Sequence, residues 1–180
     1  MDNNYVFQYW EAIENGAVTV GKWIRTIYKI LVDGLKSGKW DFDGDKANKA
    51  INFIENFCHH SEGRNDLLKL ELWQKAIVSA IFGIMDKKTG YRQFREVFIV
   101  VARKNGKTLF AAAIAAYMTY IDGEYGAKVY FLAPKLDQAD LVYDAFYQIV
   151  QADDELESIT KKRRSDTVSY THLTLPTTPY

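Results

Sequence analysis

Residues 101–108 carry the side chains of this chain that are best placed to do chemistry, in the order Val-Ala-Arg-Lys-Asn-Gly-Lys-Thr. An apolar, β-branched run at 97–101 precedes the loop, and an alanine-rich run at 109–118 follows it. The first run is typical of a strand and the second of a helix. A strand, a tight loop ending in Gly-Lys-Thr and a helix are the context that a phosphate-binding loop requires. The segment therefore predicts a loop that binds a phosphorylated ligand.

The residue types of this loop define the chemistry expected of it. Backbone N–H groups at a helix N-terminus bind phosphate oxygens, and Gly106 allows the backbone to approach them closely. Lys107 is expected to reach the β- and γ-phosphates as a point charge and to act in catalysis. The hydroxyl of Thr108 is expected to bind Mg²⁺. The predicted ligand is therefore a nucleotide carrying a β- and a γ-phosphate, bound together with Mg²⁺.

The loop departs from the common pattern at its first position, where Val101 stands in place of a glycine. The residues that follow, Arg103, Lys104 and Asn105, are unusually polar and basic. A Gly-Lys-Thr triplet also occurs in ordinary surface turns, so the triplet alone leaves both interpretations open. The predicted strand and helix on either side favour the phosphate loop.

Composition limits the other possibilities. Basic and acidic residues are equal in number, 23 of each, so bulk charge does not favour a nucleic-acid binder and any such role needs a local patch. Cys58 is the only cysteine, which excludes an intramolecular disulfide and favours a reducing compartment. No apolar run is as long as a membrane span. With 180 residues, we expect one domain with a small helical appendage.

The spacing of apolar residues predicts the elements that must position the loop. Helical spacing predicts six helices, and short apolar runs predict two strands. The predicted helices run from about 7 to 16, 18 to 35, 45 to 57, 67 to 83, 108 to 120 and 136 to 151, and the strands span 91–101 and 127–133. Strands that alternate with helices in this way predict a parallel sheet with helices on its faces.

The loop and two further segments resemble the N-terminal part of the large terminase subunit of tailed bacteriophages. Residues 103–108 match the variant phosphate loop of these motors, which lacks the first glycine. Residues 70–74, Leu-Glu-Leu-Trp-Gln, are similar to the adenine-recognition segment of the family. Ala-Pro at 133–134 with Gln-Ala at 138–139 is similar to the segment that follows the second strand. The resemblance covers roughly the first 165 residues.

The resemblance implies an α/β fold: an incomplete phosphate-loop NTPase of the RecA/ASCE type, with a parallel sheet, preceded by an N-terminal helical region. We expect the helical region at 1–66 and the partial ATPase domain at 67–167. Residues 168–180 resemble a translated sequencing adapter, so we expect a non-native, irregular tail there. Deleting this tail after Thr167 should not change the stability of the protein. A genuine disordered tail is the alternative.

The resemblance also implies roles for individual residues, with ATP and Mg²⁺ as cofactors. Trp73 and Gln74 would recognise adenine, since a side-chain amide can pair with an adenine edge. Arg103 would face the γ-phosphate and stabilise its charge during transfer, as a catalytic residue. Lys104 and Asn105 would complete the cofactor-binding loop. The plainer interpretations are that Trp73 is a core residue, Gln74 faces water, and Arg103 and Lys104 are exposed, solvated charges.

The function that the resemblance implies is DNA packaging. ATP hydrolysis by the complete protein would drive double-stranded DNA through the portal protein into procapsids, and a C-terminal endonuclease missing from this chain would cut the DNA. The implied partners are the DNA, the portal, the small terminase subunit and further copies in a ring, in the cytoplasm of the bacterial host and without a membrane. No apolar strand ending in Asp-Glu, which motor ATPases use to hold Mg²⁺, follows 127–133. We therefore expect this chain to bind nucleotide weakly and not to hydrolyse it.

Two other interpretations remain open at this point. One is a different nucleic-acid motor, a helicase or a restriction-type translocase with a similar core. The other is a non-enzymatic assembly or DNA-binding module with a vestigial phosphate loop. Nucleotide binding separates the second alternative from the motors. A basic run at 161–164, Lys-Lys-Arg-Arg, would suit DNA phosphates but is more often a solvated segment.

Overall fold

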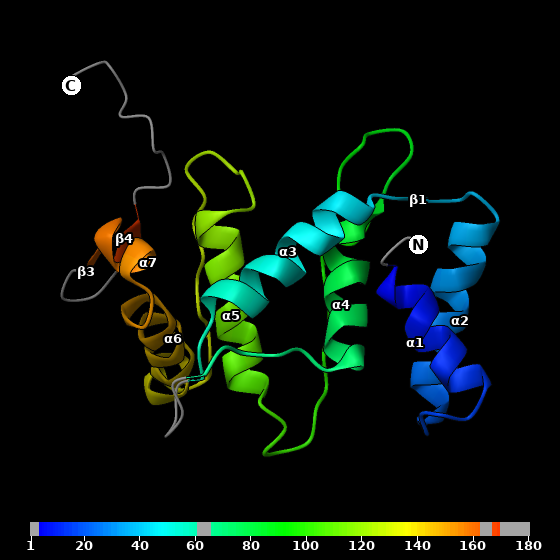
Figure 1. Cartoon of the computed structure of the whole chain (residues 1–180), viewed down its shortest axis with the longest axis horizontal. Helices are drawn as coiled ribbons and strands as arrows, with labels where there is room; N and C mark the ends of the chain where they lie inside the picture. Colours follow the sequence, from blue (N-terminus) through cyan, green and yellow to red (C-terminus); the bar gives the residue numbers. More distant parts are fainter. Residues whose placement is uncertain (1–3, 61–65, 163–166, 170–180) are drawn as a thin grey trace. The chain divides into compact units, whose positions relative to one another are not determined.

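The computed structural model describes residues 4–60, 66–162 and 167–169, drawn in colour in Figure 1. The chain divides into two compact units. The first comprises Met1–Asn52 and Lys69–Val100, and the second comprises Phe53–Leu68 and Val101–Tyr180. Among the described helices, none is long and apolar enough to cross a membrane.

The first unit is a small helical bundle with one short antiparallel ladder. Its elements are α1 Tyr5–Glu14, α2 Lys22–Lys36, β1 Asp41–Phe42, the first part of α3 Gly44–Phe57, α4 Leu72–Gly83 and β2 Ile84–Met85. α1 packs against both α2 and α4. The core between these elements is apolar and consists of Val6, Tyr9, Ile13, Tyr28, Leu31, Val32, Trp40, Ala76 and Ile84. The predicted helices in this unit are confirmed, although α2 begins at Lys22 rather than near 18 and α4 at Leu72 rather than near 67.

Local chemistry explains where α1 begins. The Asn4 side chain accepts hydrogen bonds from the backbone N–H groups of Val6, at 3.1 Å, and Phe7, at 3.4 Å. These are two of the N–H groups that have no partner within a helix, and asparagine is among the preferred residues for capping them. The helix then buries Tyr9 and Ile13 one turn apart.

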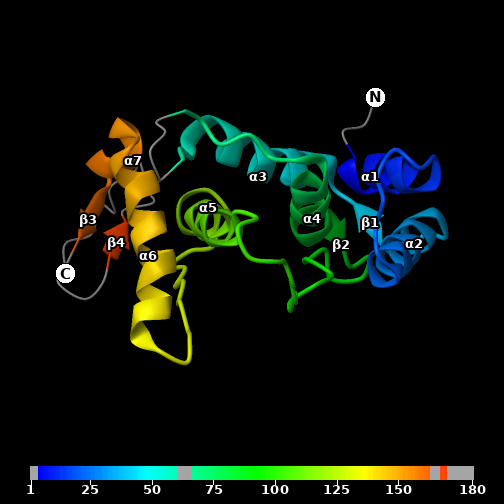
Figure 2. The same ribbon diagram turned by 90° about the horizontal axis from the view of Figure 1, so that it is seen from below.

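The second unit is built on two packed helices. It contains the end of α3, α5 Lys107–Tyr120, α6 Leu136–Gln151, α7 Asp154–Ser158 and the antiparallel strands β3 Thr160–Lys162 and β4 Thr167–Ser169. α5 packs along α6, and α7 with β3 follows the end of α6 (Figures 1 and 2). Alanine has the highest helix propensity and needs little space, which suits the buried alanines of α5. These are Ala112, Ala113, Ala115 and Ala116.

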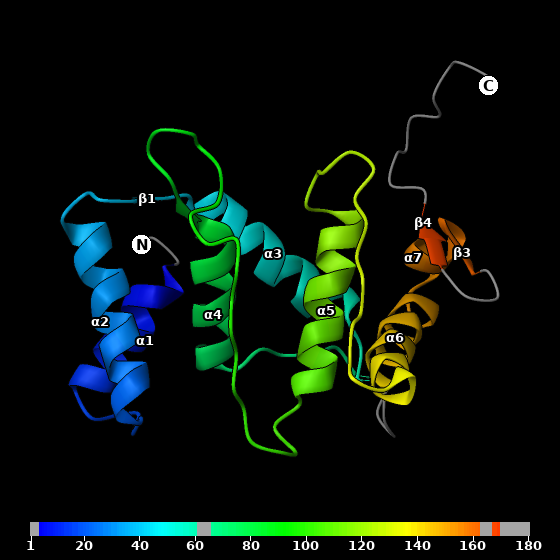
Figure 3. The same cartoon turned by 180° about the vertical axis from the view of Figure 1, so that it is seen from behind.

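The two predicted strands do not form in this structure. Segments 91–101 and 127–133 are extended chain without a ladder partner among the described residues, apart from an isolated bridge between Met85 and Arg92 (Figure 3). A strand is stable only when neighbouring chain pairs with its backbone groups. The described sheets are antiparallel pairs, and the predicted parallel sheet is absent from them.

The end of the chain also differs from expectation. Val168 and Ser169, predicted to be irregular, lie in β4, which pairs with β3 in the register Lys161 with Val168 and Thr160 with Ser169. Residues 163–166 and 170–180 lie outside the described structure, so part of the basic run at 161–164 and most of the predicted tail are not described. The proposed domain boundary at residue 66 and the non-native origin of the tail stay predictions.

Candidate nucleotide-binding site

The predicted phosphate loop connects segment 91–101 to the N-terminus of α5. Gly106 is the N-cap of α5 and lies in the left-handed region, with φ 64° and ψ 18°. Glycine adopts this conformation without the steric cost that an L side chain incurs. The first backbone hydrogen bond of the helix runs from Phe110 N–H to the Gly106 carbonyl, at 2.9 Å. The predicted helix start is therefore confirmed to within one residue.

The N-terminus of α5 offers unpaired backbone donors. The N–H groups of Lys107, Thr108 and Leu109 precede the first intrahelical bond, and no side chain caps the helix. The partial positive charge of a helix N-terminus adds to these donors. Such a terminus is suited to bind a phosphate group.

The charged side chains of the loop are exposed to solvent. Arg103, Lys104 and Lys107 are exposed, and none of them forms an ion pair within the described part of the chain. Thr108 is half-buried at the first turn of α5. Three uncompensated cations at one helix N-terminus give a local positive potential, although the chain as a whole is neutral. The loop therefore has the electrostatic character that an anionic ligand needs.

The side chain of Asn105 interacts with its own loop. Its Nδ2 donates hydrogen bonds to the carbonyl oxygens of Ala102 and Arg103, both at 3.3 Å. The prediction placed Asn105 among the cofactor-binding residues by position in the motif. In this structure its amide instead connects two carbonyls of the turn that precedes Gly106.

Gln74 has a structural role at the start of α4. Its Oε1 accepts the backbone N–H of Glu71 at 2.9 Å, and the Glu71 side chain accepts the N–H of Gln74 in return. This reciprocal capping box explains why α4 begins at Leu72 rather than near Leu67. The Gln74 side chain is buried, at 8% exposure, so the expectation of a glutamine facing water is wrong. Its role toward adenine stays a prediction.

Trp73 lies beside Gln74 on α4 and packs against the core of the first unit. It is half-buried, which agrees with the plainer interpretation of a core aromatic and leaves part of the ring accessible. Trp73 and Gln74 belong to the first unit, whereas residues 101–108 belong to the second. The predicted adenine-binding and phosphate-binding residues therefore lie in different compact units.

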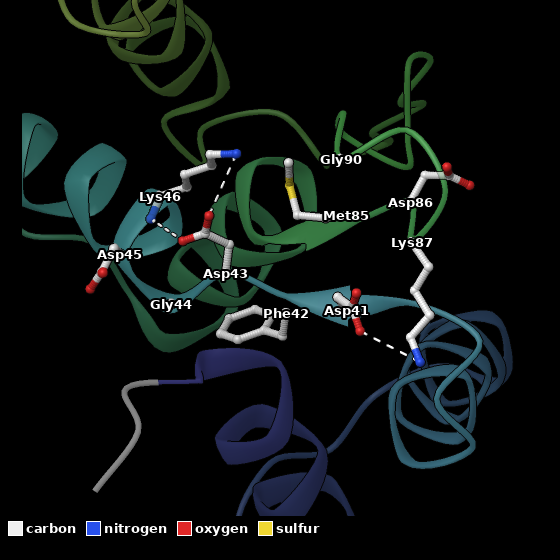
Figure 4. Close-up of a pocket in the computed structure, with 10 residues that line it drawn as sticks. All are labelled: Asp41, Phe42, Asp43, Gly44, Asp45, Lys46, Met85, Asp86, Lys87 and Gly90. Carbon is white, nitrogen blue, oxygen red and sulfur yellow. Dashed lines mark hydrogen bonds and ion pairs between the residues drawn. The ribbon is translucent and has the colours of Figure 1, made fainter.

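Sequence reasoning did not single out one hollow of the first unit. It has a volume of about 540 Å³ and is lined by Asp41, Phe42, Asp43, Gly44, Asp45, Lys46, Met85, Asp86, Lys87 and Gly90 (Figure 4). Two of the acidic groups are paired, Asp43 with Lys46 at 3.5 Å and Asp41 with Lys87 at 3.6 Å. The described residues contain no group of three or more side chains suited to hold a metal ion. No predicted site residue lines this hollow.

Asp86, another acidic residue that lines this hollow, accepts hydrogen bonds from nearby backbone N–H groups. Asp86 Oδ1 accepts the N–H groups of Thr89, at 2.8 Å, and Lys88, at 3.1 Å. Hydrogen bonds from the Thr89 backbone and hydroxyl lower the pKa of Asp86, because they favour its charged form. This carboxylate therefore closes a turn. The alternating aspartates at 41, 43 and 45 are a sequence signal that could have indicated the hollow.

The loop that ends at Gly106 and the N-terminus of α5 place this chain among proteins with a candidate phosphate-binding loop at the start of a helix. Comparison with known families identifies the family. A family profile described as the ATPase domain of the terminase large subunit matches residues 72–173, more than half of the chain. The chain therefore belongs to the terminase large subunit family and contains its N-terminal ATPase portion. The match begins at the first residue of α4 and continues beyond Thr167, into the segment expected to be non-native.

A solved structure agrees with this assignment at the level of fold. The crystal structure of the large terminase of bacteriophage HK97 aligns with a TM-score of 0.55 and 24% identity, over 69% of this chain and 25% of that one. The present chain thus spans about a quarter of the length of that protein. Comparison with curated proteins gives no match.

Proposed function

We propose that this chain is the ATP-binding N-terminal portion of a motor that packages phage DNA. Membership of the terminase ATPase family carries this proposal, and the uncapped, basic N-terminus of α5 supports it. In the complete protein, ATP hydrolysis would drive double-stranded DNA through the portal into procapsids in the host cytoplasm. The small terminase subunit, the portal and other copies in a ring would be its partners, and a separate endonuclease segment would cut the DNA.

Each loop residue has a role in this proposal. Lys107 and the N–H groups of the first turn of α5 would bind the β- and γ-phosphates. The hydroxyl of Thr108 would coordinate Mg²⁺, which would neutralise charge between those phosphates. Arg103 would stabilise the charge that develops on the transferring phosphoryl group. The exposure of Arg103 and Lys107 leaves both side chains accessible to a ligand.

Adenine recognition by Gln74 remains part of the proposal in a modified form. The oxygen that accepts the Glu71 N–H has a second lone pair, and the side-chain amide also has N–H donors. Gln74 would therefore keep its capping bond while it presents one donor and one lone pair to the base. The half-buried ring of Trp73 would contribute a flat apolar surface beside it.

The two predicted strands, 91–101 and 127–133, would form only in the complete motor. Phe98 and Leu132 are 94% and 92% exposed, although each lies in a run of apolar residues. Buried strands of parallel sheets are apolar on both faces, which is the pattern of the runs at 97–101 and 129–133 within these segments. We propose that they pair in the complete protein, where further chain would cover them.

The test of the proposed function is substitution of Lys107 by alanine in the full-length protein. We expect ATP hydrolysis and DNA packaging to be abolished while the circular dichroism spectrum is unchanged, because the exposed lysine supports ligand binding and not the core. Lys49→Ala is the matched control, since it also removes one exposed lysine, on α3 and outside the loop, and should retain the activity. Near wild-type hydrolysis by folded Lys107→Ala protein would overturn the proposal.

A further inference from the structure

Residues 102–105 form the turn that precedes Gly106, with Arg103 and Lys104 at its centre. The Asn105 side chain supports this turn, because its Nδ2 lies 3.3 Å from the carbonyl oxygens of both Ala102 and Arg103. Asparagine side chains commonly supply such local hydrogen bonds to the backbone.

Lys104, inside this turn, has an unusual backbone conformation. Its φ is 67°, and among the described residues it is the only non-glycine with a positive φ. A left-handed conformation brings Cβ close to the following carbonyl oxygen, so a lysine adopts it only when surrounding structure holds it there. The third position of such turns is usually glycine or asparagine. The two hydrogen bonds of the Asn105 amide are the interactions that span this position.

The left-handed residues at 104 and 106 surround a single residue, Asn105. Asn105 itself does not have a positive φ, so the sign of φ changes at each step from 104 to 106. Loops in which successive residues alternate in hand turn their backbone N–H groups toward one side, which is how they bind anions. If Lys104 relaxed to a right-handed or extended conformation, the peptide that joins it to Asn105 would rotate and its N–H would leave that concavity. The conformation of Lys104 therefore decides whether the loop is ready for phosphate before the ligand arrives.

We infer that Asn105 is a positioning residue whose side-chain amide holds Lys104 in the left-handed conformation and so preforms the phosphate loop. This inference rests on the proposed function, and it assigns the Asn105 side chain to the loop itself and not to the nucleotide. A preformed loop binds phosphate more tightly, because the free energy of binding no longer includes the cost of moving Lys104 into the left-handed conformation.

The test uses this 180-residue chain and a set of variants. Asn105→Ala removes the amide, and we expect Mg-ATP and inorganic tripolyphosphate to bind roughly five- to tenfold more weakly, the effect of losing one or two hydrogen bonds. Adding Lys104→Gly should recover most of that loss, because glycine adopts positive φ without cost. Adding Lys104→Ala instead should recover none of it. The two double variants lose the same charge, so they differ only in backbone preference.

A second measurement reports the backbone directly. NMR chemical shifts and the three-bond coupling between the amide and α protons of residue 104 report its φ in the absence of ligand. We expect the left-handed conformation in the wild-type chain, its loss in Asn105→Ala and its return when glycine is added at 104. Unchanged shifts and unchanged phosphate affinity in Asn105→Ala, or equal recovery by glycine and alanine at 104, would overturn the inference. A wild-type chain that binds neither ligand would overturn the proposed function instead. The chemical shifts would still test whether the Asn105 side chain holds Lys104 in the left-handed conformation.

Discussion

Gln74 shows how one side chain can serve structure and be a candidate for recognition. Its capping bond to the Glu71 N–H and its low exposure connect it to the start of α4. A role toward adenine would use the amide N–H donors, which the capping bond does not involve. Variants that separate the oxygen from the amide can therefore separate the two roles.

Gln74→Glu and Gln74→Ala form such a pair. Glutamate keeps an oxygen acceptor for the Glu71 N–H, so we expect the free energy of unfolding to stay close to wild type, whereas alanine should lose about 1 kcal/mol. Both variants should weaken ATP more than GTP in binding titrations, because both lack the amide donors. If glutamate binds both nucleotides as the wild type does, Gln74 is a capping residue and the adenine assignment fails.

Cys58 is a fully buried core residue, and its surroundings favour the neutral thiol. Burial raises its pKa to about 12, and the Asp153 carboxylate adds to this effect. Since the folded state favours the neutral thiol, the stability it provides is complete below the ordinary pKa near 9 and is lost as pH rises toward 12.

We therefore expect alkaline destabilisation between pH 9 and pH 12, by at most about 1.4 kcal/mol per pH unit from this group. Urea unfolding as a function of pH measures it. Cys58→Ala should lower stability at neutral pH and flatten the alkaline decline relative to wild type. Buried Tyr120, whose pKa is raised to about 12, contributes in the same pH range and remains in both proteins. An equally steep decline in both proteins would contradict the assignment to Cys58.

At the scale of elements, the packing of α4 against β1 and α3 requires a residue without a side chain at Gly83. A Cβ at Gly83 would lie 2.7 Å from the ring of Phe42 and 2.9 Å from the Cβ of Ala47. Gly83 is fully helical and its φ is not positive, so space and not backbone freedom requires glycine there.

Gly83→Ala should lower the free energy of unfolding by roughly 1–3 kcal/mol, the range for overpacking a core. Gly44→Ala is the matched control, because its Cβ would meet Phe42 at an ordinary 3.8 Å, and it should change stability by less than about 0.5 kcal/mol. Chemical denaturation of the two variants measures the difference. Equal stability would show that Phe42 and Ala47 move aside freely.

At the scale of the whole molecule, ligand protection can show which parts of the chain meet the nucleotide. We expect Mg-ATP and inorganic tripolyphosphate both to slow hydrogen exchange at the start of α5, since both carry the phosphates that the loop would bind. Only Mg-ATP should also protect the start of α4, where Trp73 and Gln74 lie. Protection of α4 by tripolyphosphate, or of neither element by Mg-ATP in excess, would contradict this prediction.

The sequence determined the features that depend on neighbouring residues. The helix predicted at 108–120 and found at 107–120 follows from residue types and spacing within one short segment, because a helix satisfies its hydrogen bonds internally. The family could be recognised from the same residues, since a motif of this kind is local. Most helices were predicted for the same reason, including α6, whose bounds agree with the expectation.

Only the tertiary structure decided which apolar residues are buried and which strands pair. Ile30 and Leu31 are adjacent apolar residues of α2, yet Leu31 is buried at 7% exposure and Ile30 is 55% exposed. Burial depends on what packs against a helix, and α1 packs against α2. Segments 91–101 and 127–133 have the composition of strands but no partner in the described residues, because a strand completes its hydrogen bonds only with chain from elsewhere. The capping bond of Gln74 and the turn held by Asn105 likewise depend on side-chain geometry that spacing does not specify.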